Sequence, residues 1–211
     1  MRIVEVDAER IPRWFANFAD RNGGLTDAQT TAEGIRAIAG NGTVAECVAP
    51  FAGSWAPVGD PVEALSTHVV ADRRVGVLLV RLGGYAAGVF NGTKLVDSKV
   101  GSRQVHGRTS AGGWSQQRFA RRRENQVDVA LDTATEVAAR ILLPHAGSLG
   151  ALVLGGERTA VDKVLADRRL AGLAGVTVEP RFLTVPDPKH AVLLTTPAMF
   201  RAVRIHLTDP A

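Results

Sequence analysis

The chain has 211 residues, of which 45% are hydrophobic, and a formal net charge of +4. A chain of this size can bury one substantial core, or one core with a small annex. No apolar stretch approaches the roughly 20 residues that cross a bilayer, and the first residues lack the pattern of a signal peptide. The single cysteine, Cys47, falls in an apparent strand and has no partner for a disulfide. We therefore expect a soluble, cytoplasmic protein without membrane association or redox chemistry.

The first part of the chain predicts a helix and a small antiparallel meander. Residues 7–21 place Ile11, Trp14, Phe15 and Phe18 on one helical face, and two glycines follow. Three β-prone runs come next, at residues 25–31, 34–39 and 43–49. An irregular connection with three prolines then covers residues 50–61. It favours a division into residues 1–56, helix plus meander, and residues 57–211, within one compact unit overall.

The second part alternates helices and strands. Asp60 and Pro61 predict the N-cap and first position of a helix that ends near Ala71. Strands at 75–82, 85–91 and 94–100 follow, the last two joined by an Asn-Gly hairpin turn. The remaining predicted elements are a long helix from about Gln117 to Leu143, a strand at 152–154, a helix to about Leu170, a strand at 182–185, and a final helix that Thr196 caps, with Pro197 at its first position and Phe200, Val203 and Leu207 on one side. This order predicts an α/β fold with a mixed sheet.

One basic segment stands out from the rest of the chain. From Ser98 to Arg123 there is no Asp or Glu. The seven basic residues of this segment are Lys99, Arg103, Arg108, Arg118, Arg121, Arg122 and Arg123. Subtracting their charge from the total of +4 leaves −3 for the other residues. A local cluster of this kind favours contact with a polyanion such as RNA, although a solvated surface loop has the same composition.

The basic segment also contains two glycines and two glutamines. Gly112 and Gly113 precede Trp114-Ser115, and Gln116 and Gln117 follow. Only Phe119 and Ala120 are apolar in the first turns of the long predicted helix, so these turns should project from the body. An amide can orient water or donate a hydrogen bond to developing negative charge, but it is not a strong base at neutral pH. The pattern suits hydrolysis of an already activated ester.

Other chemistries have less support in the sequence. The five histidines are scattered singly and there is no second cysteine, so we expect neither a metal nor another cofactor. Ser115 lacks the closing glycine of a G-x-S-x-G elbow, and we interpret it as a turn or capping residue.

Two further patterns leave alternatives open. An acidic strip of Glu124, Asp128, Asp132 and Glu136 along the long helix could supply magnesium to a nuclease, or it could be a solvated face. Gly155-Gly156, between a strand and a helix, could seat a phosphate or form a tight turn.

The segment Gly112-Gly113-Trp114-Ser115-Gln116, with the basic helix behind it, resembles the release-factor-like peptidyl-tRNA hydrolases of actinobacteria. These are related to the eukaryotic ankyrin-repeat and zinc-finger peptidyl-tRNA hydrolases and to the catalytic domain of eukaryotic peptide release factors. The likeness covers nearly the whole chain. It implies an RNase H-like α/β domain that enters the large ribosomal subunit and cleaves peptidyl-tRNA.

By this resemblance, Gln116 orients the attacking water, and Gly112 and Gly113 permit the loop conformation. The basic residues of the segment would hold ribosomal RNA or the end of the tRNA. In release factors the two glycines directly precede the glutamine, which leaves Gln117 as a rival to Gln116. Two other hypotheses remain at this stage: a non-catalytic ribosome- or RNA-binding factor, and a metal-dependent nuclease.

Overall fold

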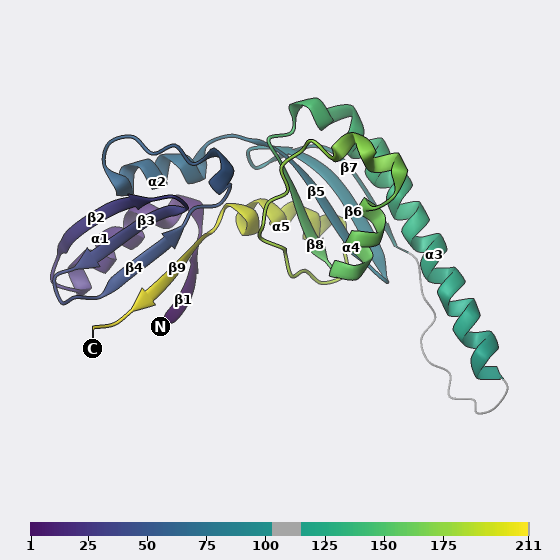
Figure 1. The fold of residues 1–211 in the computed structure, drawn as a ribbon, viewed down its shortest axis with the longest axis horizontal. Coiled ribbons are helices and arrows are strands. Elements are labelled where there is room, and N and C mark those ends of the chain that lie inside the picture. Colours follow the sequence, from purple (N-terminus) through teal and green to yellow (C-terminus); the bar gives the residue numbers. More distant parts are fainter. Residues whose placement is uncertain (103–114, 211) are drawn as a thin grey trace. The chain divides into compact units, whose positions relative to one another are not determined.

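The computed structural model describes residues 1–102 and 115–210, with side chains for residues 1–102 and 127–210 (Figure 1). The chain forms two compact units. The first contains residues 1–72 and the C-terminal residues from Pro197 onward, and the second contains residues 73–196. The boundary predicted at residues 56/57 differs from this division, because helix α2 (Pro61–Val70) packs against helix α1 (Ile11–Arg21) in the first unit.

The first unit is an antiparallel sheet with two helices on one face. The strand order is β1-β9-β4-β3-β2. The strands are β1 (Arg2–Val6), β2 (Leu25–Thr31), β3 (Gly34–Ala39), β4 (Val44–Val48) and β9 (Val203–Thr208). Short 3-10 helices η1 (Ala8–Arg10) and η2 (Ala52–Ser54) connect these elements. The core includes Ile11, Phe15, Ile35, Leu65 and Ile205, all of which are buried.

The predicted meander is confirmed, since β2, β3 and β4 pair in sequence. The N-cap is also confirmed, because the Oδ1 atom of Asp60 accepts a hydrogen bond of 2.9 Å from the backbone N–H of Glu63. Strand β1 was not predicted. It is an edge strand in which only Val6 is buried, and its partner β9 lies at the other end of the sequence.

The second unit is built on a mixed four-stranded sheet of order β7-β6-β5-β8. Strands β5 (Arg74–Arg81), β6 (Gly84–Asn91) and β7 (Lys94–Ser102) are antiparallel neighbours, whereas β8 (Ala151–Gly156) is parallel to β5. The crossover from β7 to β8 contains helix α3 (Ser115–Leu142) and the 3-10 helix η3 (Leu143–Ser148). The predicted α/β fold with a mixed sheet is therefore confirmed.

Helices cover both faces of this sheet. Helix α3 and helix α4 (Arg158–Leu165) share a core with Leu78, Val89 and Leu152 on one face. The 3-10 helix η4 (Arg168–Leu173) packs against α3 and contributes Leu170 and Leu173 to the same core. On the other face, Leu193 of helix α5 packs closely against Gly88, where a Cβ atom would lie 3.0 Å from the Cδ2 atom of Leu193. Both faces are buried, which explains the near-continuous apolar runs in β5 and β8.

Two predictions at the end of the chain are wrong. Helix α5 (His190–Arg201) begins before Thr196 and contains Pro197 in its interior. Pro197 cannot donate to the carbonyl of Leu193, but the Oγ1 atom of Thr196 donates to that oxygen at 2.7 Å and replaces the lost bond. The predicted helical face through Val203 and Leu207 is instead strand β9, in which buried and exposed residues alternate.

The predicted strand at residues 182–185 is also absent from the structure. This segment makes only an isolated parallel bridge between Leu183 and Gly155. Pro180, Pro186 and Pro188 flank it. A proline has no N–H for a ladder, so the segment cannot extend into a full edge strand.

Candidate nucleic-acid interface

Helix α3 carries the two glutamines of the candidate site. It begins at Ser115, slightly before the predicted start, so Gln116 and Gln117 lie in its first turn. The structure therefore describes the backbone of Gln116 as helix and not as loop. The four arginines Arg118, Arg121, Arg122 and Arg123 follow in the next turns of the same helix. Gly112, Gly113, Arg103 and Arg108 lie outside the described residues.

The C-terminal part of α3 is the part that packs on the sheet. Its buried apolar residues are Ala134, Val137, Ala138, Ile141 and Leu142. Figure 1 shows the beginning of the helix extending past the end of the sheet. At about 1.5 Å per residue, the part before Val127 is about 18 Å long. This agrees with the sequence, in which the apolar face of the helix is plain only from Val127 onward.

The electrostatics of the helix start favour an anion. The N-terminus of an α-helix carries a partial positive charge from its unpaired N–H groups. An acidic residue usually offsets this charge, but α3 has none in its first turn. The arginines from Arg118 to Arg123 add further positive charge close by. The beginning of α3 therefore combines two sources of positive potential, and a phosphate group is the natural counter-charge.

A small apolar pocket lies where α3 leaves the sheet. It is lined by Val80, Arg81, Leu82, Gly84, Tyr85, Val127, Ala130 and Leu131. Tyr85 also covers the end of β7, since a Cβ atom on Gly101 would lie 2.2 Å from the tyrosine oxygen. Strand β7 ends at Ser102, within the basic segment. Of the predicted RNA-binding residues, Lys99 is the one whose side chain the structure describes. It is exposed on β7, opposite Ala87.

Backbone hydrogen bonds hold the turn at Gly155-Gly156 in place. The N–H of Gly156 donates to the carbonyl of Leu183 at 2.9 Å, and the N–H of Glu157 donates to that of Val80 at 2.8 Å. Gly156 has a φ of +103°, which favours glycine. Both amides already donate to carbonyls of the fold, which favours the tight turn, the second interpretation of the sequence.

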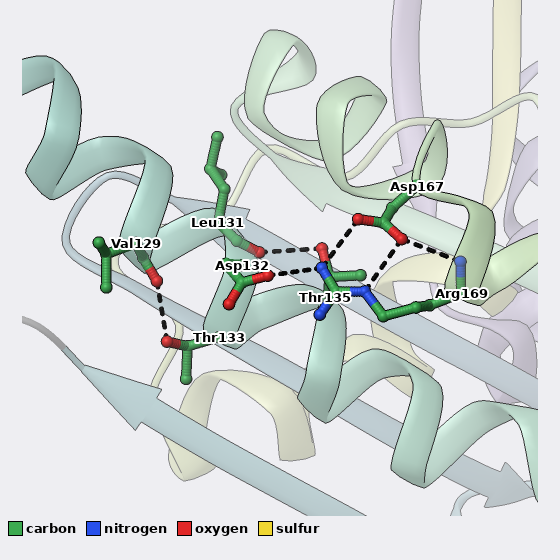
Figure 2. A network of polar contacts seen from close by, with 7 residues as sticks. All are labelled: Val129, Leu131, Asp132, Thr133, Thr135, Asp167 and Arg169. Carbon is green, nitrogen blue, oxygen red and sulfur yellow. Dashed lines mark hydrogen bonds and ion pairs between the residues drawn. The ribbon is translucent and has the colours of Figure 1, made fainter.

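The acidic strip is partly used for structure. Figure 2 shows Asp132 of α3 and Asp167, the N-cap of η4, on either side of Arg169. An NH2 group of Arg169 donates to Asp132 at 2.6 Å and to Asp167 at 2.8 Å. These hydrogen bonds from Arg169, together with one from its backbone N–H, lower the pKa of Asp167 to about 2. Among the residues that the structure describes, no three His, Cys, Asp or Glu side chains form a group that could hold a metal ion.

Sequence reasoning missed two features of this region. The pocket around Tyr85 and the Arg169 bridge both join segments that are distant in the sequence, and Asp132 and Arg169 are 37 residues apart. No local pattern marks either feature. A charge pair between two helices becomes visible only when the packing of those helices is known.

None of the helices within residues 1–102 and 115–210 has the length and apolar character required to cross a membrane.

A sequence comparison identifies the family of the chain. The profile of the Actinobacteria/chloroflexi VLRF1 release factor matches residues 73–206. Because this match covers more than half of the chain, the protein belongs to this release-factor family. The release-factor resemblance drawn from the sequence is thereby confirmed.

The protein is also similar to solved structures. A crystal structure of the archaeal translation termination factor aRF1 is 16% identical, with a TM-score of 0.41, over 78% of this chain and 51% of that chain. The chain thus spans about half the length of that factor. A structure described as the Vms1 mitochondrial localization core is 9% identical, with a TM-score of 0.47, over 97% of this chain and 82% of that chain. None of the curated proteins matches the chain.

Proposed function

We propose that this protein is a peptidyl-tRNA hydrolase that releases nascent peptides from stalled ribosomes or large ribosomal subunits. Membership of a release-factor family supports a role in release at the ribosome. One observation carries the finer proposal. A helix that begins at Ser115 starts beyond the end of its sheet, with Gln116 in its first turn and four arginines behind it.

In the proposed reaction, water attacks the ester that joins the peptide to the tRNA. The side-chain amide of Gln116 accepts a hydrogen bond from this water and orients its oxygen toward the carbonyl carbon. A new C–O bond forms, the bond to the ribose oxygen breaks, and a proton moves from the water to that oxygen. Since an amide is not a base at neutral pH, the contribution of Gln116 is orientation, and the surrounding RNA stabilises the developing charge.

The basic residues would hold the RNA. In this proposal Gly112 and Gly113 let the backbone approach the ester closely. Ribosomal RNA or the tRNA end is bound by Lys99, Arg103, Arg108, Arg118, Arg121, Arg122 and Arg123. Neutralising phosphates releases counterions, so binding should weaken steeply with salt. Removing one of these charges, as in Arg121→Ala, should reduce the slope of log K against log salt by about 0.7–1. A factor with these partners acts where ribosomes are, in the cytoplasm.

Peptide release from purified large subunits tests the proposal. The subunits carry peptidyl-tRNA with a labelled peptide, and the wild-type protein should release it. Gln116→Ala should slow release by about 100-fold or more, as for loss of one transition-state hydrogen bond. Gln117→Ala is the matched control and should slow release by less than about threefold. A large loss with Gln117→Ala alone would move the role to that residue.

The same assay separates the alternative functions. Association with the subunit but no release by the wild-type protein would identify a non-catalytic RNA-binding factor and reject the proposal. Cleavage of the RNA that a chelator prevents would identify a nuclease. Ester hydrolysis by Gln116 should leave the RNA chains intact, because the proposed step breaks only the bond between the peptide and the ribose oxygen.

A further inference from the structure

Arg169 connects the long helix to the rest of the second unit. It lies in η4, and its guanidinium reaches Asp132 in the middle of α3 (Figure 2). The same guanidinium binds Asp167 with both oxygens, through Nε at 3.0 Å and an NH2 group at 2.8 Å. The backbone N–H of Arg169 also donates to Asp167 at 2.9 Å, which caps η4. One side chain therefore ties a helix cap to α3.

This bridge has the geometry of an effective surface ion pair. Isolated exposed pairs contribute little, because both side chains must be ordered and water screens the charges. Here Asp167 already holds the guanidinium in a planar contact through two hydrogen bonds. Forming the contact with Asp132 therefore costs less side-chain freedom. The side chains of Asp132 and Arg169 are 60% and 39% exposed, so the bridge lies at the surface and not in the core.

The position of Asp132 along α3 determines which part of the helix the bridge constrains. Val127, Ala130 and Leu131 line the pocket beside Tyr85 at the point where the helix leaves the sheet. The deeply buried residues begin only at Ala134. Asp132 therefore lies near the N-terminal limit of the part of α3 that contacts the rest of the second unit. A lateral contact there controls the direction of the N-terminal part of the helix, which carries Gln116.

We propose that Arg169 is a positioning residue, which fixes the direction of α3 through Asp132 and so sets the place to which Gln116 is delivered. The role rests on the proposed hydrolase function. Gln116 lies about 24 Å from Asp132 along the helix axis, and a rotation of about 5° there displaces it by about 2 Å. A displacement of this size is enough to disturb catalysis, since about 1 Å can cost on the order of 100-fold in rate.

Peptide release by bridge variants is the first test. Asp132→Ala removes the contact with α3 but keeps Arg169 on Asp167, so the cap of η4 survives. It should lower the maximal release rate by about 10-fold or more and change the half-saturating subunit concentration by less than about threefold, because the RNA-binding arginines remain. Arg169→Ala should give a similar loss, and the double variant should lose no more than either single one.

Two variants of the same short helix act as controls. Arg168→Ala removes an exposed arginine next to Arg169 without touching either aspartate, and its release rate should equal that of the wild type. Arg169→Lys keeps a cation within reach of the carboxylates and should recover part of the rate. If Arg169→Ala lowers the melting temperature, the release rate of Asp132→Asn is the deciding measurement, because this substitution preserves the shape of the side chain. A full release rate for Asp132→Asn and Asp132→Ala would overturn the proposal.

A distance measurement separates this inference from the proposed function. Spin labels at Glu124→Cys in α3 and Lys163→Cys in α4 report the direction of the helix in the full-length protein. Burial raises the pKa of the Cys47 thiol to about 12, so this cysteine stays protonated and is not labelled. The distance distribution should be narrow with Arg169 present and should broaden in Arg169→Ala and Asp132→Ala. Broadening without any release by the wild type would reject only the hydrolase, whereas unchanged distributions would reject the positioning role.

Discussion

A proline in α3 should separate the delivery of Gln116 from the stability of the fold. Asp128 is exposed and lies in the helix next to Val127, where the helix leaves the sheet. Asp128→Pro removes the N–H that donates to the carbonyl of Glu124, and the ring clashes with that carbonyl. Proline is one of the few causes of sharp helix kinks, those of more than about 20°. Gln116 is about 18 Å further along the axis, so a kink of about 20° displaces it by about 6 Å.

We expect this displacement to abolish release. The helix-breaking cost of a proline is about 3 kcal/mol. Most of it falls on the projecting part of α3, because Ala134, Ala138 and Leu142 keep their buried contacts. The free energy of unfolding should therefore fall by less than about 3 kcal/mol.

The assay compares Asp128→Pro with Asp128→Ala, which removes the same charge and keeps the helix. Single-turnover release from large subunits and urea unfolding are measured for both. The alanine variant should behave as the wild type in both measurements, and the proline variant should lose release by more than about 100-fold. Wild-type release by Asp128→Pro would show that the ribosome, and not α3, determines where the amide lies.

Three further predictions concern the fold that supports the site. Gly156→Ala should destabilise the protein by at least about 2 kcal/mol in urea unfolding, because the residue has a φ of +103° and the new Cβ would lie 2.2 Å from the carbonyl oxygen of Val80; Gly147→Ala, with nothing within 4 Å, is the neutral control. Cys47 should not react with a thiol reagent at pH 8 until the protein unfolds, because burial raises its pKa to about 12; rapid reaction of the native protein would contradict this. Hydrogen bonds from Arg169 lower the pKa of Asp167 to about 2, so its stabilising effect is present above its ordinary pKa of 3.8 and is lost as the pH falls toward 2. The spin-label distances should accordingly be constant from about pH 5 to 8 and broaden only near pH 3 or below; broadening at pH 6 would exclude this carboxylate as the cause.

Local signals in the sequence predicted most elements of the fold. The predicted hairpin lies between β6 and β7, but Asn91 is the last residue of β6 and the two-residue loop is Gly92-Thr93, with Gly92 at a φ of +59°, which favours glycine. The cap at Asp60 and the apolar face of α3 from Val127 were equally readable. In each case the deciding residues are neighbours in the chain.

The wrong predictions depend on contacts between distant segments. Val203, Ile205 and Leu207 alternate as in a strand, but a helical spacing also fits Val203 and Leu207, and only pairing with β1 and β4 decides. Pro197 suggested a helix start because the hydroxyl of Thr196, which compensates for it inside α5, could not be foreseen.

The candidate site divides in the same way. Its charge and its glutamines are local composition, so the sequence alone predicts them as a site. The start of α3 at Ser115 lies two residues before the predicted one. The bridge from Arg169 to Asp132 depends on tertiary packing, and the sequence contained no signal for it.

The most direct test of the account measures release and subunit binding in the same samples of Gln116→Ala. Labelled peptide freed from large subunits and protein that cosediments with them are quantified together against the wild type. We predict that cosedimentation is unchanged while release falls to the spontaneous rate. Release at the wild-type rate by this variant would contradict the claim that α3 brings a catalytic amide to the ester.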